Sequence, residues 1–345
     1  MAKSSKNAGW PGFFRLFAVL CAIMGLLARQ GSALSASAGD QRVFRVYVLL
    51  TLWAVPALFM VWGMSALEDG KSASVSGMLL GYALPTLVTF IVWGTIYAVT
   101  AHLLGGGGFS LSLIWQKLTA TARSGSTGCL SLLYPLLGLY LVLPVLRRFT
   151  ASASRGEVLW FLALCFVVSS LLPRWLVLRP NDVLPLFLNR LNVPMTAGFV
   201  GYFVGGWYLY HYVISRISEY ILYILGIAGL ALTLMADRFS ALSLDTYSAP
   251  GVVCTSAALC TLFRYVLGIS EERSRRRAVY SLGQYAFGAY LVHHLWVLIF
   301  RWFGASVLAF PPVLSVPFFA LLYFALSLPV ALLLGLIPGV GRWLT

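Results

Sequence analysis

Two adjacent histidines, His293 and His294, are the residues of this sequence whose type and place point most directly to chemistry. They lie in an apolar run that begins near Gly283. A helix rising 1.5 Å per residue would carry them ~15 Å into a bilayer, close to its midplane. Histidine titrates near neutral pH and is the usual general base. An ionisable pair is costly at this depth, which favours a catalytic role over a pair that only hydrogen-bonds neighbouring helices.

Three further polar residues have a place near this pair or near a run end. Tyr290 precedes His293 by three residues and His294 by four, so it can share a helix face with either. Arg301 follows His294 by seven residues, about two turns, and we assign it to substrate binding. Arg15 lies about one turn into the first apolar run. It either extends to the membrane surface or contacts an anion such as a phosphate of a cytosolic cofactor.

The elements that must position these residues are long apolar runs. Hydrophobic residues make up 60% of the chain and charged residues only 10%, whereas soluble domains are typically about 25% charged. About ten runs approach the ~20 apolar residues that a helical membrane crossing needs. We predict an all-α, polytopic transmembrane bundle of about ten helices, forming a single domain over residues 1–345. The predicted spans lie near 12–29, 43–66, 78–101, 128–146, 157–173, 195–213, 219–236, 249–267, 283–305 and 314–338.

The charge pattern predicts the orientation. The net charge is +14, and the basic residues gather at the run ends, which indicates topology and contact with anionic lipid rather than nucleic acid. With the N-terminus inside, the inner segments hold most of the 24 Lys and Arg residues, including the cluster Arg273–Arg277, so both termini are predicted to be cytoplasmic. Alternatively, the first run is a signal peptide, because Lys3 and Lys6 precede it and Ala36–Ala38 resembles a cleavage site.

Other features point to structure rather than chemistry. The five cysteines show neither metal-type spacing nor a secreted disulfide pattern, so we predict buried free thiols and no metal site. The segment Gly105–Gly108 lacks the Gly-Lys-Ser/Thr ending of a phosphate-binding loop and is predicted to be a flexible turn. Prolines are expected to interrupt several spans. They are Pro56, Pro85, Pro135, Pro144 and Pro329.

Five short patterns, each weak alone, occur in order along the chain. They are Phe14–Ala18 (Phe-Arg-Leu-Phe-Ala), Val55–Gly63 (Val-Pro-Ala-Leu-Phe-Met-Val-Trp-Gly), Leu139–Pro144 (Leu-Tyr-Leu-Val-Leu-Pro), Tyr202–Gly206 (Tyr-Phe-Val-Gly-Gly) and Gly288–His293 (Gly-Ala-Tyr-Leu-Val-His). In this order they resemble the motifs of the acyltransferase-3 family of integral-membrane acyltransferases, which typically have ten or so helices. The last pattern is the most specific, and the resemblance covers nearly the full length.

The resemblance implies an activity and a set of roles. Such enzymes take an acyl group, usually acetyl from acetyl-CoA, and pass it to a hydroxyl of a cell-envelope acceptor, such as exopolysaccharide, cellulose-like glucan, O-antigen, periplasmic glucan or a lipid-linked sugar. His293 would be the general base, supported by Tyr290 and His294. Arg15 would contact the CoA phosphates or pantetheine, and Tyr202 would line the acyl path. We therefore expect a bacterial inner-membrane protein with acyl-CoA as co-substrate, no bound cofactor, and polysaccharide-synthesis proteins as candidate partners.

The chain departs from the family pattern at three polar positions. Leu26 stands where the family has a His, eleven residues and about three turns after Arg15. Trp62 replaces a Ser, and Cys129–Ser131 replaces a His-x-Trp. These departures leave three alternatives. The chain uses His293 or His294 as base by a divergent mechanism, it uses Cys129 as an acyl-accepting thiol, or it is a non-catalytic binding or assembly subunit. A transporter or flippase with midplane polar residues along its path is a further alternative.

Overall fold

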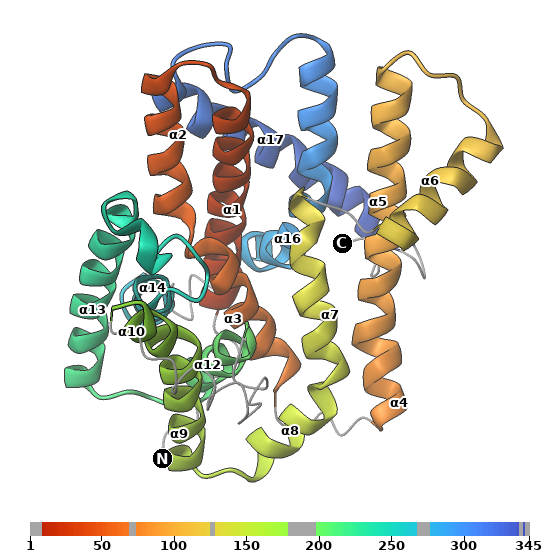
Figure 1. Cartoon of the computed structure of the whole chain (residues 1–345). Coiled ribbons are helices and arrows are strands. Elements are labelled where there is room, and N and C mark those ends of the chain that lie inside the picture. The colour runs from red at the N-terminus through yellow and green to blue at the C-terminus, as the bar shows by residue number, and fades with distance from the viewer. Residues whose placement is uncertain are drawn as a thin grey trace. The chain divides into compact units, whose positions relative to one another are not determined.

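A computed structural model describes residues 9–68, 74–124, 128–178, 198–267, 277–337 and 341 (Figure 1). All regular structure in these residues is helical, which confirms the all-α prediction. The chain forms two compact units, each built from separate stretches of sequence and each described by itself. Unit 1 comprises Met1–Ala18, Leu49–Ser72 and Val142–Arg277, and unit 2 comprises Val19–Val48, Ala73–Leu141 and Ala278–Thr345.

Two helices contribute to both units, and the others belong to one unit or nearly so. The shared helices are α1 (Trp10–Leu34) and α2 (Ala38–Thr51). Unit 1 has α3 (Ala54–Ala66), α8 (Leu143–Ser152), α9 (Arg155–Phe166), the π-helix η3 (Val167–Leu171), α10 (Leu172–Leu178), α12 (Val200–His211), α13 (Arg216–Leu234), the 3₁₀ helix η5 (Ala236–Leu242) and α14 (Pro250–Tyr265). Unit 2 has α4 (Val75–Met78), the π-helix η1 (Leu79–Ala83), α5 (Leu84–Leu104), α6 (Leu111–Ser124), the 3₁₀ helix η2 (Gly128–Leu132), α7 (Leu133–Leu141), α16 (Arg277–Trp302) and α17 (Pro312–Gly335).

Many of these helices can cross a membrane. Six helical stretches of the described residues are long and apolar enough, or seven if the broken helix over residues 128–152 counts as one span. The protein is therefore a multi-pass membrane protein. The other predicted runs are also helical, but α12 has 12 residues and α14 has 16, short of the ~20 that a crossing needs. The count of about ten spans, the cytoplasmic termini and the single domain stay predictions.

Prolines mark several helix starts. Pro144 lies in the first two positions of α8, directly after the bend between α7 and α8, and Pro85 lies at the same place in α5, directly after the π-helix η1. Pro144 fits there because its missing N–H would have had no partner in the first turn of α8. Pro329 lies inside α17 instead. The long apolar runs are thus divided into shorter helical pieces, and these pieces allow the side chains of one run to face different neighbours.

Small residues set the closest helix packing in unit 1. Helix α3 packs on α12, and a Cβ added to Gly63 would fall on the backbone of Phe203, while one added to Gly206 would fall on the backbone of Met60. Helices α13 and α14 approach in the same way where Gly229 meets Gly251. Interfaces between membrane helices use small residues because close backbone approach gives van der Waals contact that lipid cannot offer.

Unit 2 contains a helix that the sequence did not predict. Helix α6 follows the Gly105–Gly108 turn and packs on α5, beside which it lies in Figure 1, where Gly94 leaves room for Thr121. It begins after Ser110, whose Oγ accepts from the backbone N–H of Leu113 at 3.1 Å. The helix is amphipathic and has 14 residues, too short for a span, so it does not stand out in the sequence as a long apolar run.

Some sequence predictions concern residues that the structure does not describe. Lys3, Lys6 and residues 273–276 of the basic cluster lie outside the described residues. The segment Ala36–Ala38, which resembles a cleavage site, is exposed and runs from the turn between α1 and α2 into the first residue of α2. Retention of the first helix stays a prediction.

Candidate active site

Helix α16 carries the histidine pair in the interior of unit 2. His293 and Tyr290 are 1% and 2% exposed, and His294 is half-buried. The helix reaches this position because Ala286 and Ala289, both fully buried, let neighbouring segments approach its backbone. The same three residues that the sequence grouped by spacing therefore lie together in the structure.

The hydrogen bonding of His293 fixes its tautomer. Its Nδ1 pairs with the backbone carbonyl oxygen of Tyr290, one turn earlier. A carbonyl oxygen can only accept, so Nδ1 carries the proton and Nε2 of the neutral ring carries the lone pair. The ring is thereby oriented by the main chain, and Nε2 is the nitrogen that can take a proton from a substrate.

Tyr97 of α5 contacts both the backbone and a histidine ring of α16. The Tyr97 hydroxyl donates to the backbone carbonyl of Leu291, and its ring meets the His294 ring edge-on, with centroids 4.9 Å apart at 69°. Trp93 packs on Tyr97 from one turn earlier, with ring centroids 5.7 Å apart. Tyr97 thus holds α5 against the part of α16 that carries the histidines.

The short helix η2 supplies the third side. The hydroxyl of Tyr290 donates to the backbone carbonyl of Cys129 at 3.0 Å, and the Cys129 thiol lies 3.7 Å from the Tyr97 hydroxyl. Cys129 is 2% exposed. We call these residues the His293 cluster: Tyr97, Cys129, Tyr290, His293 and His294. In it, Cys129 contributes a backbone acceptor as well as its thiol.

Sequence reasoning missed two residues of this region. Tyr97 is 194 positions from its acceptor Leu291, and no local signal connects them. Trp296 follows His293 by three residues, so helical spacing could have found it. Its indole Nε1 is buried and has no hydrogen-bond partner within the described part of the chain. A buried donor left without a partner costs free energy, so this group is a candidate for binding a ligand atom.

Arg301 and two of the positions that depart from the family pattern, Leu26 and Trp62, are not part of the His293 cluster. Arg301 is exposed in the last turn of α16, and the His293 cluster does not include it. Leu26 is half-buried on α1. Trp62 is buried in α3 of unit 1, where its ring packs edge-on against Phe59, with centroids 5.2 Å apart. The position of the family Ser is therefore filled by an apolar ring that packs inside its unit.

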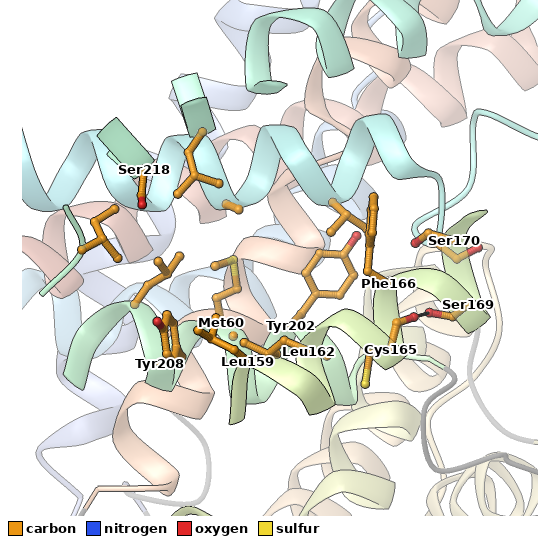
Figure 2. A pocket seen from close by; sticks show the side chains of 18 of the residues that line it. Met60, Leu159, Leu162, Cys165, Phe166, Ser169, Ser170, Tyr202, Tyr208 and Ser218 are labelled. Carbon is orange, nitrogen blue, oxygen red and sulfur yellow. Dashed lines mark hydrogen bonds between the residues drawn. The ribbon is translucent and has the colours of Figure 1, made fainter. Parts of the chain in front are cut away.

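Two predicted site residues belong to unit 1. Arg15 is half-buried on α1 with its Nε in the interior. Next to it, Phe14 and Phe17 stack on Trp53 with ring centroids 6.5 and 5.6 Å apart. Tyr202 on α12 is buried, and its hydroxyl donates to the backbone carbonyl of Tyr247 at 2.5 Å. Its ring lines a cavity of about 450 Å³ (Figure 2).

The chain matches one known protein family over nearly its whole length. The family model described as an acyltransferase domain matches residues 6–336. The chain belongs to the acyltransferase-3 family. This confirms the resemblance drawn from the five short patterns, and it makes the protein a member of a family of membrane acyltransferases. No curated protein and no solved structure matches the chain.

Proposed function

We propose that this protein is a membrane O-acyltransferase that moves an acetyl group from acetyl-CoA to a hydroxyl of a cell-envelope glycan. The observation that carries the proposal is the buried His293 ring, whose Nδ1 is held by the Tyr290 carbonyl so that Nε2 bears the lone pair. The family match supports the reaction class. The donor, the acceptor and a bacterial inner-membrane location follow from the family resemblance and are part of this proposal.

His293 acts as the general base in this mechanism. Nε2 takes the proton of the acceptor hydroxyl as the hydroxyl oxygen attacks the thioester carbonyl carbon. A C–O bond forms, the C–S bond breaks, and the proton passes from the imidazolium to the departing CoA thiolate. The Tyr290 carbonyl keeps its bond to the Nδ1 proton throughout and so favours the charged ring. A positioned base of this kind contributes typically 10²–10⁴-fold in rate.

Trp296 supplies the hydrogen bond that the developing oxyanion needs. Its buried Nε1–H is on the same helix as His293 and one turn further, and it has no protein partner among the described residues. Donors aimed at charge that develops in the transition state are worth about 10²–10³ in kcat. Binding of the thioester oxygen would also satisfy a donor that is otherwise buried at a cost.

Three predicted residues bind rather than react in this proposal. Arg15 pairs with CoA phosphates, since a guanidinium forms two parallel bonds to phosphate oxygens. Tyr202 offers an apolar ring, because its hydroxyl is already bonded to Tyr247. Arg301 is exposed at the end of α16 and can meet an acceptor at the membrane surface.

A second candidate function is a non-catalytic subunit that binds a glycan or assembles a polysaccharide machine. Leu26 favours it, because an apolar side chain stands where the family has a histidine and cannot take a proton. Both functions involve binding of a glycan, but only the acyltransferase turns over acetyl-CoA. Restoring the family residue separates them further, because Leu26→His creates acyl transfer only in a chain that has lost it.

The test is turnover of labelled acetyl-CoA by the purified full chain in detergent, with an envelope glycan fraction as acceptor. We expect CoA release and labelled glycan that disappear in His293→Ala and persist in His102→Ala, a matched loss of a histidine outside the cluster. Equal turnover by the wild type and His293→Ala would remove His293 as the base. Absence of both turnover and acetyl-CoA binding would favour the binding subunit.

A further inference from the structure

Unit 1 holds a cavity that contains no residue of the His293 cluster. Its volume is about 450 Å³, within the range of small-molecule sites, and it is lined mainly by α9, α12, α13 and α14 (Figure 2). Helix α12 packs on α9 and on α14, and α14 packs on α13. The four helices therefore pack in the order α9, α12, α14 and α13, and the cavity lies among them.

The wall formed by α12 is apolar and lacks bulk. Gly201 and Gly205 both face α9, where an added Cβ would lie 3.1 Å from Cys165 and 3.6 Å from Leu162. Tyr202 presents its ring, since its hydroxyl is bonded away from the cavity lining. The glycines thus let α9 approach α12 closely and leave this part of the cavity wall without side chains, which we call the slot.

The cavity reaches the surface through residues that face lipid. Leu159 of α9 is 45% exposed and Ile221 of α13 is 50% exposed, and both line the cavity. Both helices belong to candidate spans that are mostly exposed. Only 17% of the apolar segment in residues 155–178, and 22% of that in residues 216–234, is buried inside the protein. A hydrocarbon chain from the bilayer can therefore enter sideways.

One end of the cavity lies where four helix ends meet. Helices α9 and α13 begin there, and α12 and α14 end there. Two hydrogen bonds join these helix ends, from Arg155 Nε to the Tyr208 hydroxyl at 3.0 Å and from the Ile214 N–H to the Tyr265 hydroxyl at 3.1 Å. The candidate spans over residues 155–178 and 216–234 both begin at this end, so it is expected at the level of lipid head groups.

The charges at this end favour an anion. Glu219 is paired with Arg216 at 2.9 Å, and Glu157 is bonded to the first turn of its own helix in a capping box. Arg264 donates to backbone carbonyls at the end of α12. Arg155 stands over two tyrosine rings at 5.9 and 5.7 Å, and its two terminal nitrogens make no hydrogen bond to any described residue.

The cavity lining is at least as long as the hydrocarbon depth of one leaflet. Figure 2 shows the lining running from Tyr208 and Ser218 past Tyr202 to Ser169. Arg155 and Ser169 are 14 residues apart on one continuous helical stretch, which corresponds to about 21 Å. Half of the bilayer's hydrocarbon core is about 15 Å thick. A chain anchored at Arg155 would therefore run the depth of its leaflet inside the protein.

We propose that this cavity binds one hydrocarbon chain of an anionic phospholipid, with the phosphate on Arg155. The slot, its opening toward lipid and the cationic end each fit a part of such a molecule. The inference does not rest on acyl transfer, since its site lies within unit 1 and the His293 cluster lies within unit 2. Tyr202, which the sequence predicted beside an acyl group, forms part of the lipid site.

The test is photolabelling of the full chain in detergent with phosphatidylglycerol that carries a diazirine in its acyl chain. Labelled peptides are mapped by mass spectrometry, and unlabelled phosphatidylglycerol and phosphatidylcholine compete. We expect label on α9 and α12 beside the cavity. Phosphatidylglycerol should compete at about fivefold lower concentration, the ratio expected from ~1 kcal/mol per basic residue near an anionic head group.

Two pairs of variants separate the chain from the head group. Gly205→Leu fills the slot and should abolish the cavity label, whereas Gly138→Leu adds the same side chain to an exposed, open helix position and should not. Arg155→Gln should remove the preference for phosphatidylglycerol, whereas Arg148→Gln, a loss of the same charge at another exposed site, should keep it. Leu159→Trp at the mouth is a second blocking variant if Gly205→Leu does not fold.

Loss of label in the blocking variants together with loss of preference in Arg155→Gln supports the proposal. Label spread evenly over the outer faces of the spans, and unaltered by Gly205→Leu and Leu159→Trp, would overturn it as ordinary bilayer contact. Equal competition by the two lipids would overturn the role of Arg155.

Discussion

The close crossing of α3 and α12 can be tested with two neighbouring glycines. A Cβ at Gly206 would lie 2.5 Å from both Cα and the carbonyl carbon of Met60, well inside van der Waals contact, and the obstructing atoms are backbone. A Cβ at Gly205 meets only the end of the Leu162 side chain at 3.6 Å, an ordinary contact. Gly206→Ala should therefore separate the two helices, whereas Gly205→Ala should not.

The difference between the two variants isolates the packing cost. Each replacement gains up to ~1 kcal/mol of helix propensity, and this gain cancels in the comparison. Overpacking a well-packed interior costs about 1–3 kcal/mol. Gly206→Ala should thus be ~1–3 kcal/mol less stable than Gly205→Ala, which is roughly a 5- to 150-fold difference in the folding equilibrium.

The measurement is reversible unfolding of the purified protein in mixed micelles of increasing denaturing detergent, followed by circular dichroism. We expect Gly205→Ala to unfold at or above the wild-type midpoint and Gly206→Ala clearly below it. Gly63→Ala, which meets the backbone of Phe203 from the opposite helix, should behave like Gly206→Ala. Equal midpoints for Gly205→Ala and Gly206→Ala would refute the close approach of α3 and α12.

Three further predictions concern the His293 cluster and are checked by acetyl-CoA turnover and by the same unfolding assay. Cys129→Ser should leave acyl transfer intact, because the backbone carbonyl of this residue holds Tyr290; an inactive but folded variant would instead support an acyl-thiol intermediate. Tyr290→Phe removes a buried hydrogen bond and should cost about 0.6–1.7 kcal/mol of stability. It should keep turnover, because His293 is held by the backbone carbonyl of residue 290 and not by its hydroxyl. A folded but inactive variant would argue that the hydroxyl takes part in the reaction. Trp296→Phe keeps the ring but loses the N–H, so kcat should fall about 10²–10³-fold without loss of stability, and an unchanged kcat would exclude the indole as oxyanion donor.

Part of the candidate site could be predicted from local spacing. Tyr290, His293 and His294 lie within five residues of one helix, and the helical repeat alone places Tyr290 one turn from both histidines. The sequence could not find Tyr97, which is 194 residues from its α16 partner Leu291. It named Cys129 as a candidate thiol but could not place that residue beside Tyr290, which is 161 residues away. Contacts over such separations depend on how helices pack, and no local pattern records that packing.

Composition, run length and short motifs are enough to predict that the protein lies in a membrane, that its apolar runs are helices and which family it resembles. The tertiary structure alone decided where the runs break, that α6 forms, and which helices enclose the cavity. The physical reason is that faces toward lipid and faces toward protein are both apolar in a membrane, so hydrophobic periodicity does not identify neighbours. Small residues such as Gly63 and Gly206, and buried hydrogen bonds such as that from Tyr97, decide the neighbours instead.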